Sequence, residues 1–154
     1  MKVIRYRKII VIGRLLALSS FVIAGILLFG AGLFSDYGVP RRIVYFLLSL
    51  LCFLTFGKLF LLMIYVLFKN PTMFSYDADK IIVKNTEIKR KNIAKVDLVG
   101  EVSTGFLGTE TDAFILHCKD KTTVYIPTYY ALTKKEVAGI FTALQQYVSN
   151  HKKF

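Results

Sequence analysis

The chain has 154 residues, of which 55% are apolar, 14% aromatic and 20% charged, and its net charge is +11. The apolar residues concentrate before Lys69, whereas most of the charged residues follow it. This asymmetry excludes a uniform soluble globule, a disordered chain and a disulfide scaffold. We therefore expect a membrane anchor over residues 1–69 and a water-exposed domain over residues 70–154.

Two apolar segments are each long enough to cross a bilayer. Residues 15–35 contain no charge, and residues 43–68 contain only Lys58. A helix of about 20 residues spans a hydrocarbon core of about 30 Å, and a helix satisfies its own backbone hydrogen bonds in lipid. Gly38 and Pro40 favour a turn between the two segments. The sequence therefore predicts an antiparallel transmembrane hairpin.

The distribution of lysine and arginine predicts the orientation of this hairpin. Basic residues precede the first segment and follow the second, and only two lie in the connecting loop: Lys2, Arg5, Arg7, Lys8 and Arg14 come before, Arg41 and Arg42 between, and Lys69 after. Cytoplasmic flanks are rich in such residues, so we expect both termini in the cytoplasm and the connecting loop outside. Four tyrosines near the span ends are candidates for the membrane interface: Tyr6, Tyr37, Tyr45 and Tyr65. A cleaved signal peptide is the alternative, but the apolar run is long for one and a second run follows.

Lys58 is the single charge inside the second segment. If the hydrocarbon begins at Ile43, Lys58 lies about 7 Å inside the cytoplasmic boundary. A lysine at that depth can extend its side chain to the boundary, and a functional intramembrane charge is the alternative. Pairs of small residues on the first segment would permit close helix contact: Gly13 with Ala17, and Ser20 with Ala24.

Short strands are predicted after Asn70-Pro71, where the second helix should end. They cover residues 72–76, 80–84, 87–90, 93–102, 113–119 and 122–127. Thr133 and Glu136 form a capping box at the start of a last helix, along which apolar residues recur at helical spacing from Val137 to Val148. The sheet is the candidate to cover this stripe, so we expect an α+β domain, an antiparallel barrel or sandwich capped by a C-terminal helix. A cofactor box or a partner-binding helix is the alternative interpretation of the stripe.

Several segments resemble parts of the pleckstrin-homology-like fold. They are Tyr76-Asp77 with Lys80-Ile81-Ile82 as an opening hairpin, Lys91-Asn92-Ile93 before a long strand, and Ile126-Pro127-Thr128-Tyr129-Tyr130 before the capped helix. With two apolar helices ahead of it, the chain is similar to a group of small bacterial membrane proteins with a C-terminal domain of this kind. The resemblance implies no catalytic residue. In such folds the first hairpin often carries a phosphoinositide site.

The residue pattern favours neither an enzyme nor a metal site. His117 and Cys118 are neighbours in a predicted strand and so point to opposite faces, and His151 lies in a polar tail. Cys52 falls inside the second span, which makes a bridge to Cys118 implausible. The segment Gly105-Phe106-Leu107-Gly108 lacks the lysine and the helix of a phosphate loop. We expect no catalytic residue, no metal and no cofactor.

A basic cluster follows the second span, and it is the chemical feature from which a function can be argued. Its members are Lys69, Lys80, Lys84, Lys89, Arg90, Lys91 and Lys95. Anionic headgroups attract such residues by about 1 kcal/mol each near the surface. We expect this surface to contact anionic lipid, although insertion topology alone also accounts for a basic flank. A nucleic-acid partner is not expected, because the cluster lacks interleaved aromatic residues.

The leading hypothesis is a non-enzymatic inner-membrane protein whose cytoplasmic domain contacts anionic lipid, a membrane protein partner, or both. One alternative is an immunity protein against a membrane-active bacteriocin, since some such proteins are small, basic and carry pleckstrin-homology-like domains. Another is an accessory subunit of a transporter or envelope complex, in which Lys58 and the small-residue face would be contact sites.

Overall fold

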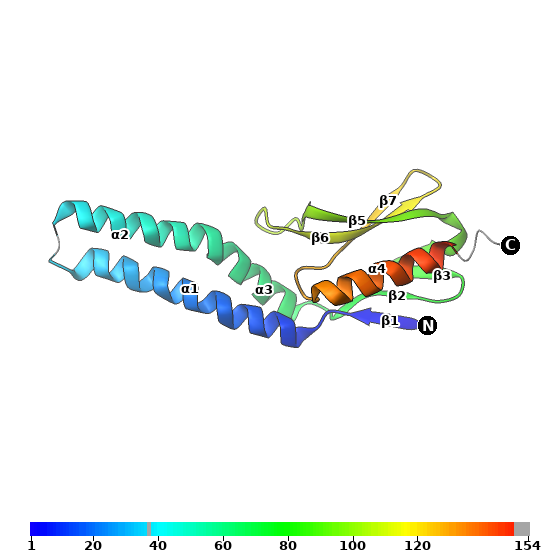
Figure 1. Cartoon of the computed structure of the whole chain (residues 1–154), viewed down its shortest axis with the longest axis horizontal. Coiled ribbons are helices and arrows are strands. Elements are labelled where there is room, and N and C mark those ends of the chain that lie inside the picture. Colours follow the sequence, from blue (N-terminus) through cyan, green and yellow to red (C-terminus); the bar gives the residue numbers. More distant parts are fainter. Residues whose placement is uncertain (37, 150–154) are drawn as a thin grey trace. The chain divides into compact units, whose positions relative to one another are not determined.

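A computed structural model describes residues 1–36 and 38–149 (Figure 1). They form two compact units, of which one is Val11–Phe68 and the other combines Met1–Ile10 with Lys69–Phe154. We refer to them as the helical hairpin and the sheet domain. The predicted boundary after residue 69 thus misplaced the first ten residues, which cluster with the C-terminal unit. Tyr37 and His151 lie outside the described residues.

Two long helices make up the hairpin. Helix α1 covers Lys8–Phe34, and the second helix consists of α2 (Val39–Cys52), a π-helical turn (Phe53–Gly57) and α3 (Lys58–Phe68). Both are long and apolar enough to cross a membrane. Pro40 lies in the first turn of α2, where its missing N–H would have had no helical partner. The predicted spans 15–35 and 43–68 fall almost entirely within these helices, which begin several residues earlier.

Small residues and aromatic rings hold the two helices of the hairpin together. The buried Ser49 hydroxyl donates to the Gly25 carbonyl at 2.9 Å, and the Phe21 and Phe56 rings stack with centroids 4.3 Å apart. A Cβ at Gly25 would lie 3.1 Å from the Cys52 Cβ, and one at Gly32 would lie 3.2 Å from the Phe46 ring. The small pairs singled out above, Gly13 with Ala17 and Ser20 with Ala24, are exposed. The contact between the helices therefore uses a different face of α1 from those pairs.

The sheet domain has an α+β fold with two antiparallel sheets. The first has the order β1-β2-β3-β4 and the second β5-β6-β7. The strands are β1 (Lys2–Arg5), β2 (Thr72–Tyr76), β3 (Lys80–Val83), β4 (Thr86–Lys89), β5 (Ile93–Ser103), β6 (Glu110–Cys118) and β7 (Thr123–Pro127), followed by helix α4 (Lys134–Ser149). A short 3-10 turn, Arg90–Asn92, joins β4 to β5. The six predicted strands and the last helix are confirmed within a few residues.

Strand β1 was not predicted, because its residues were assigned to the flank of the first span. It pairs with β2, and Ile4 lies opposite the fully buried Phe74. The helical hairpin is therefore inserted between the first and second strands of the sheet. Insertion of this kind requires that the two connecting segments lie close together.

The core of the sheet domain lies between the sheets and α4, which runs between them in the view of Figure 1. Every strand from β2 to β7 contributes residues to the buried interior, and the fully buried side chains include Phe74, Ile81, Phe114, Leu116 and Ile126. Helix α4 contributes Val137, Leu144 and Val148. Each such side chain stabilises the fold by about 1.5–3 kcal/mol through burial. The predicted apolar stripe of the last helix is thus covered by the sheets.

Candidate functional site

Two segments connect the sheet domain to the hairpin, and they lie side by side. The Tyr6 amide donates to the Pro71 carbonyl at 2.7 Å, and the Arg7 amide donates to the Ala131 carbonyl at 3.1 Å. Residues 6 and 7 precede α1, and residue 71 follows α3. The segment 128–131, between β7 and α4, therefore binds one connection directly and lies next to the other.

Tyr6 is part of the domain core. Its side chain is buried, its hydroxyl donates to the Pro127 carbonyl at 3.0 Å, and its ring meets that of Tyr129 edge-on at 5.7 Å. We predicted this ring at the membrane interface, and that prediction is wrong. The physical reason is the pairing of β1 with β2, which carries the following residue into the domain.

The turn that holds Tyr129 has an unusual backbone. Tyr129 and Tyr130 have φ angles of 50° and 55°, and the Ala131 amide donates to the Thr128 carbonyl at 2.9 Å, as in a type I′ turn. Left-handed conformations cost non-glycine residues about 1–2 kcal/mol each. Burial of Tyr129 and its contact with Tyr6 offset this strain. The Ile126–Tyr130 segment quoted above for the resemblance thus forms the turn beside the connections.

Lys69 and Lys84 meet at Tyr129. The Lys69 ammonium donates to the Tyr129 hydroxyl at 2.8 Å and lies 4.0 Å from the ring centroid. Burial raises the pKa of the Tyr129 phenol, and the positive charge of Lys84 opposes that rise. Lys84 follows Val83, which lies opposite Phe74 at the middle of β2. Because the two strands are antiparallel, the chain after Val83 runs toward the start of β2 and the connecting segments.

Basic residues from three parts of the chain therefore gather where the chain leaves the sheet domain. We name this set the junction surface: Arg5, Arg7, Lys8, Lys69 and Lys84. Arg5, Lys8 and Lys84 are exposed, and Arg7 forms an ion pair with Glu136. Only Lys69 and Lys84 were among the predicted lipid-contact residues. The other three were recognised only as topology signals, because their place in the domain depends on β1.

The other predicted residues of the β3–β4 hairpin form a second basic site. Lys80 lies opposite Lys89 across the strands, and both line a hollow of about 360 Å³ together with Arg90 and Lys91. We name it the distal hollow. Asp79 and Glu87 also line it, and the Lys80 ammonium donates to a Glu87 carboxylate oxygen at 2.8 Å. Acidic neighbours thus reduce its positive charge.

Arg90 connects the turn after β4 to the last helix. Its Nε donates to the Tyr147 carbonyl at 2.8 Å, its Nη1 donates to the Ala78 carbonyl at 3.3 Å, and its guanidinium lies 4.4 Å from the Tyr147 ring centroid. These contacts use donors that a lipid phosphate would need. Arg90 therefore has a structural role, whereas Lys89 and Lys91 are exposed.

The predicted basic cluster is thus divided in space. Lys84 is four positions after Lys80, which is about 13 Å along an extended strand, so the distal hollow and the junction surface lie at opposite ends of β3. Lys95 lies on β5 in the other sheet, where its ammonium is 2.8 Å from Asp97. The hydrogen bond from Lys95 lowers the pKa of Asp97, and nearby His117 acts in the same direction.

Neither a metal centre nor a disulfide is present in the described part of the chain. No group of three or more histidine, cysteine or acidic residues could hold a metal ion there. Cys52 and Cys118 are free thiols. Lys58 is exposed on the hairpin as the first residue after the π-helical turn.

The geometry defines a class of protein, one in which an apolar helical hairpin is inserted into an α+β sheet domain. Residues 2–152 match the family of unknown function DUF5381, and the chain belongs to that family. No curated protein and no solved structure matches it. The matched region begins in β1 and extends past α4, so the family pattern includes the strand that precedes the hairpin.

Proposed function

We propose that this protein is a non-enzymatic component of a bacterial cytoplasmic membrane, with its hairpin in the bilayer and its sheet domain in the cytoplasm. Exposed apolar side chains support the membrane assignment. Leu27 and Leu47, on α1 and α2, are 68% and 60% exposed, whereas a core helix of a soluble protein would bury such residues. Lipid is the environment that covers them on all sides.

The sheet domain is proposed to be pleckstrin-homology-like. Two antiparallel sheets closed by a C-terminal helix support this assignment. The hairpin then occupies the connection between the first two strands. Both ends of the hairpin join the domain at adjacent connecting segments, so these segments are linked covalently to the proposed spans.

The junction surface is proposed to contact anionic headgroups, and its position in the chain is the observation that carries this proposal. Lys8 is the first residue of α1, and Lys69 follows the last residue of α3. Both residues are covalently adjacent to the proposed spans, so they stay near the bilayer in any orientation of the domain. Lys80 and Lys89 lie about 13 Å further along the β3–β4 hairpin, more than the Debye length of about 8 Å at physiological salt. The junction surface is therefore favoured over the distal hollow.

A photocrosslinking experiment on the full chain tests this proposal. The protein is placed in nanodiscs that contain phosphatidylglycerol with a photoreactive headgroup, and crosslinks to the sheet domain are mapped by mass spectrometry. The Arg5→Gln, Lys84→Gln double variant should lose most of these crosslinks, because each basic residue contributes about 1 kcal/mol of attraction near the surface.

The matched control removes the same charge from the distal hollow. The Lys89→Gln, Lys91→Gln double variant should crosslink nearly as well as the original protein. A phosphatidylcholine analogue with the same photoreactive group should give low yields throughout. Equal losses in the two double variants, or equal yields with the two lipids, would contradict lipid contact by the junction surface. Neither the immunity role nor the transporter-subunit role gains a supporting contact among the described residues.

A further inference from the structure

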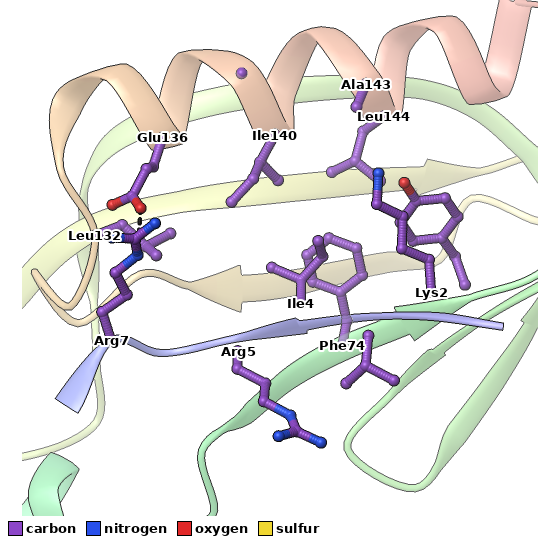
Figure 2. A pocket seen from close by; sticks show the side chains of 13 residues that line it. Lys2, Ile4, Arg5, Arg7, Phe74, Leu132, Glu136, Ile140, Ala143 and Leu144 are labelled. Atoms are coloured by element: carbon purple, nitrogen blue, oxygen red, sulfur yellow. Dashed lines mark ion pairs between the residues drawn. The ribbon is translucent and has the colours of Figure 1, made fainter.

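A groove runs between strand β1 and helix α4, and it belongs to no function considered so far. Its volume is about 370 Å³. Figure 2 shows Ile4 and Phe74 on the strand side, and Ile140 and Leu144 extending from the helix toward them. The walls are thus apolar along the middle of the groove.

Two small residues of α4 leave this space open. Gly139 and Ala143 both line the groove, and they are four positions apart, so they follow one another along one face of the helix. A Cβ placed on Gly139 would meet nothing within 4 Å. The groove therefore has room for side chains supplied from outside the domain.

Strand β1 forms one edge of its sheet. It pairs with β2 alone in the strand order of the described residues, so its other edge presents backbone donors and acceptors to an incoming strand. Four residues form β1, which corresponds to about 13 Å at 3.3 Å per residue. An extended segment of four or five residues would match this length.

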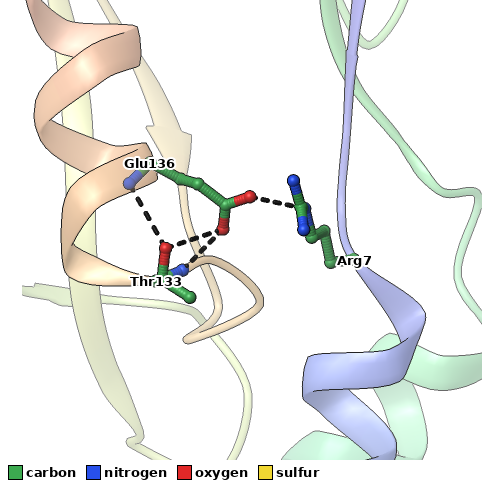
Figure 3. A network of polar contacts seen from close by, with 3 residues as sticks. All are labelled: Arg7, Thr133 and Glu136. Atoms are coloured by element: carbon green, nitrogen blue, oxygen red, sulfur yellow. Dashed lines mark hydrogen bonds and ion pairs between the residues drawn. The ribbon is translucent and has the colours of Figure 1, made fainter.

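The charges beside the groove select an acidic segment. Lys2, Arg5 and Arg7 line it, and Glu136 is the one acid among the lining residues. That carboxylate already binds Arg7 and the Thr133 amide (Figure 3). Lys2 and Arg5 are therefore left as net positive charges along β1, Lys2 on the face toward α4 and Arg5 on the opposite face.

The register of β1 determines which face of an added segment would be apolar and which would be acidic. Ile4 lies opposite Phe74 on the face toward α4, and Figure 2 shows Arg5 pointing away from α4. Side chains on one strand alternate between the two faces of a sheet. A paired segment would thus place apolar residues under α4 and acidic residues beside Arg5.

We propose that this groove binds an extended segment of another protein, in which acidic and apolar residues alternate, by adding it as a strand at the free edge of β1. Backbone hydrogen bonds provide the pairing and the alternate side chains provide the selectivity, as in other cases of strand addition. The proposal does not depend on lipid contact by the junction surface.

Fluorescence anisotropy on the full chain in detergent micelles tests the proposal. The probe is a fluorescein-labelled eight-residue peptide in which glutamate and valine alternate. It should bind saturably, and a peptide with lysine in place of glutamate should bind at least tenfold more weakly. In Gly139→Leu the new side chain fills the groove without altering charge, and the affinity should fall at least tenfold. Ala138→Leu, on an exposed neighbouring position, should bind as the original protein does.

Hydrogen exchange gives an independent measure, because the added strand should slow exchange of the amides in Lys2–Arg5. Unchanged melting temperatures in the two leucine variants would show that both remain folded. The proposal is overturned if the glutamate peptide does not bind saturably, if the lysine peptide binds equally well, or if Gly139→Leu has no effect. It is also overturned if oleate binds the protein, Gly139→Leu weakens that binding, and the glutamate peptide does not occupy the groove.

Discussion

The helical hairpin and the sheet domain use the same residue types in opposite ways. In the hairpin, large apolar side chains such as Leu27 and Leu47 are exposed, and the buried positions include Gly25, Gly32 and Ser49. In the sheet domain, large side chains such as Phe74 and Phe114 are buried, and lysines cover the surface. This difference agrees with the proposed membrane location of the hairpin, because lipid does not drive large apolar side chains into the contact between two helices.

The largest expected effect comes from removing the helical hairpin and testing the sheet domain alone. A variant in which residues 1–8 are joined to residues 69–154 by a short glycine–serine linker should fold as a soluble domain, because the Tyr6 amide and the Pro71 carbonyl are only 2.7 Å apart. The fragment 70–154 lacks β1 and Tyr6, and should not fold. Loss of one buried aromatic side chain alone costs about 3–5 kcal/mol, which approaches the whole stability of a small domain.

Circular dichroism during urea unfolding measures both polypeptides. The linked variant should unfold in one cooperative transition, and the fragment should show no transition of its own. Equal stability of the two would mean that β1 is dispensable, and the assignment of Met1–Ile10 to the sheet domain would fail.

The absence of β1 from the sequence prediction has a physical cause. Lys2-Val3-Ile4-Arg5 is a four-residue run with a charge at each end, and its partner strand begins at Thr72. No local signal reveals a pairing across that separation. The capping box of Thr133 and Glu136 was predicted and is confirmed, because it depends on residues three positions apart.

The basic residues illustrate the same limit. Lys80 and Lys84 are close in sequence, yet they lie at opposite ends of β3, whereas Lys80 and Lys89 lie opposite each other across two strands. A list of charges along the chain predicts that a basic surface exists. Its division into a junction surface and a distal hollow depends on where the strands turn.

The second prediction tests packing inside the hairpin. Gly25→Leu should destabilise the hairpin by about 1–3 kcal/mol, because even a Cβ there would lie 3.1 Å from the Cys52 Cβ. Gly30→Leu is the matched control, since a Cβ at Gly30 meets nothing within 4 Å. Unfolding of the full chain in dodecyl maltoside titrated with dodecyl sulfate measures the difference. If the two variants unfold alike, the contact between the helices does not use Gly25.

The third prediction concerns the polar contacts beside the connections. Tyr6→Phe removes the hydroxyl that donates to the Pro127 carbonyl at 3.0 Å, and it should lower the free energy of unfolding of the linked soluble variant by about 1–2 kcal/mol. Tyr125→Phe is the control, because Tyr125 is 50% exposed. Equal midpoints in urea for the two variants would show that the Tyr6 hydroxyl contributes nothing.

The smallest expected effect is a dependence of domain stability on pH through Glu136. The hydrogen bond from the Thr133 amide lowers the pKa of this carboxyl below its usual value of 4.5, and the Arg7 charge acts in the same direction. Because folding lowers the pKa, ionised Glu136 stabilises the folded domain above pH 4.5, and this stabilisation disappears as the pH falls through the lower folded value.

Glu136→Gln should therefore destabilise the linked variant by about 1 kcal/mol at pH 7, the usual size of a capping contribution, and by much less at pH 3. Lys135→Gln, on the neighbouring exposed position, should show no such convergence at low pH. If the difference in free energy of unfolding between Glu136→Gln and the original domain is the same at pH 7 and pH 3, the carboxylate charge does not stabilise the start of α4.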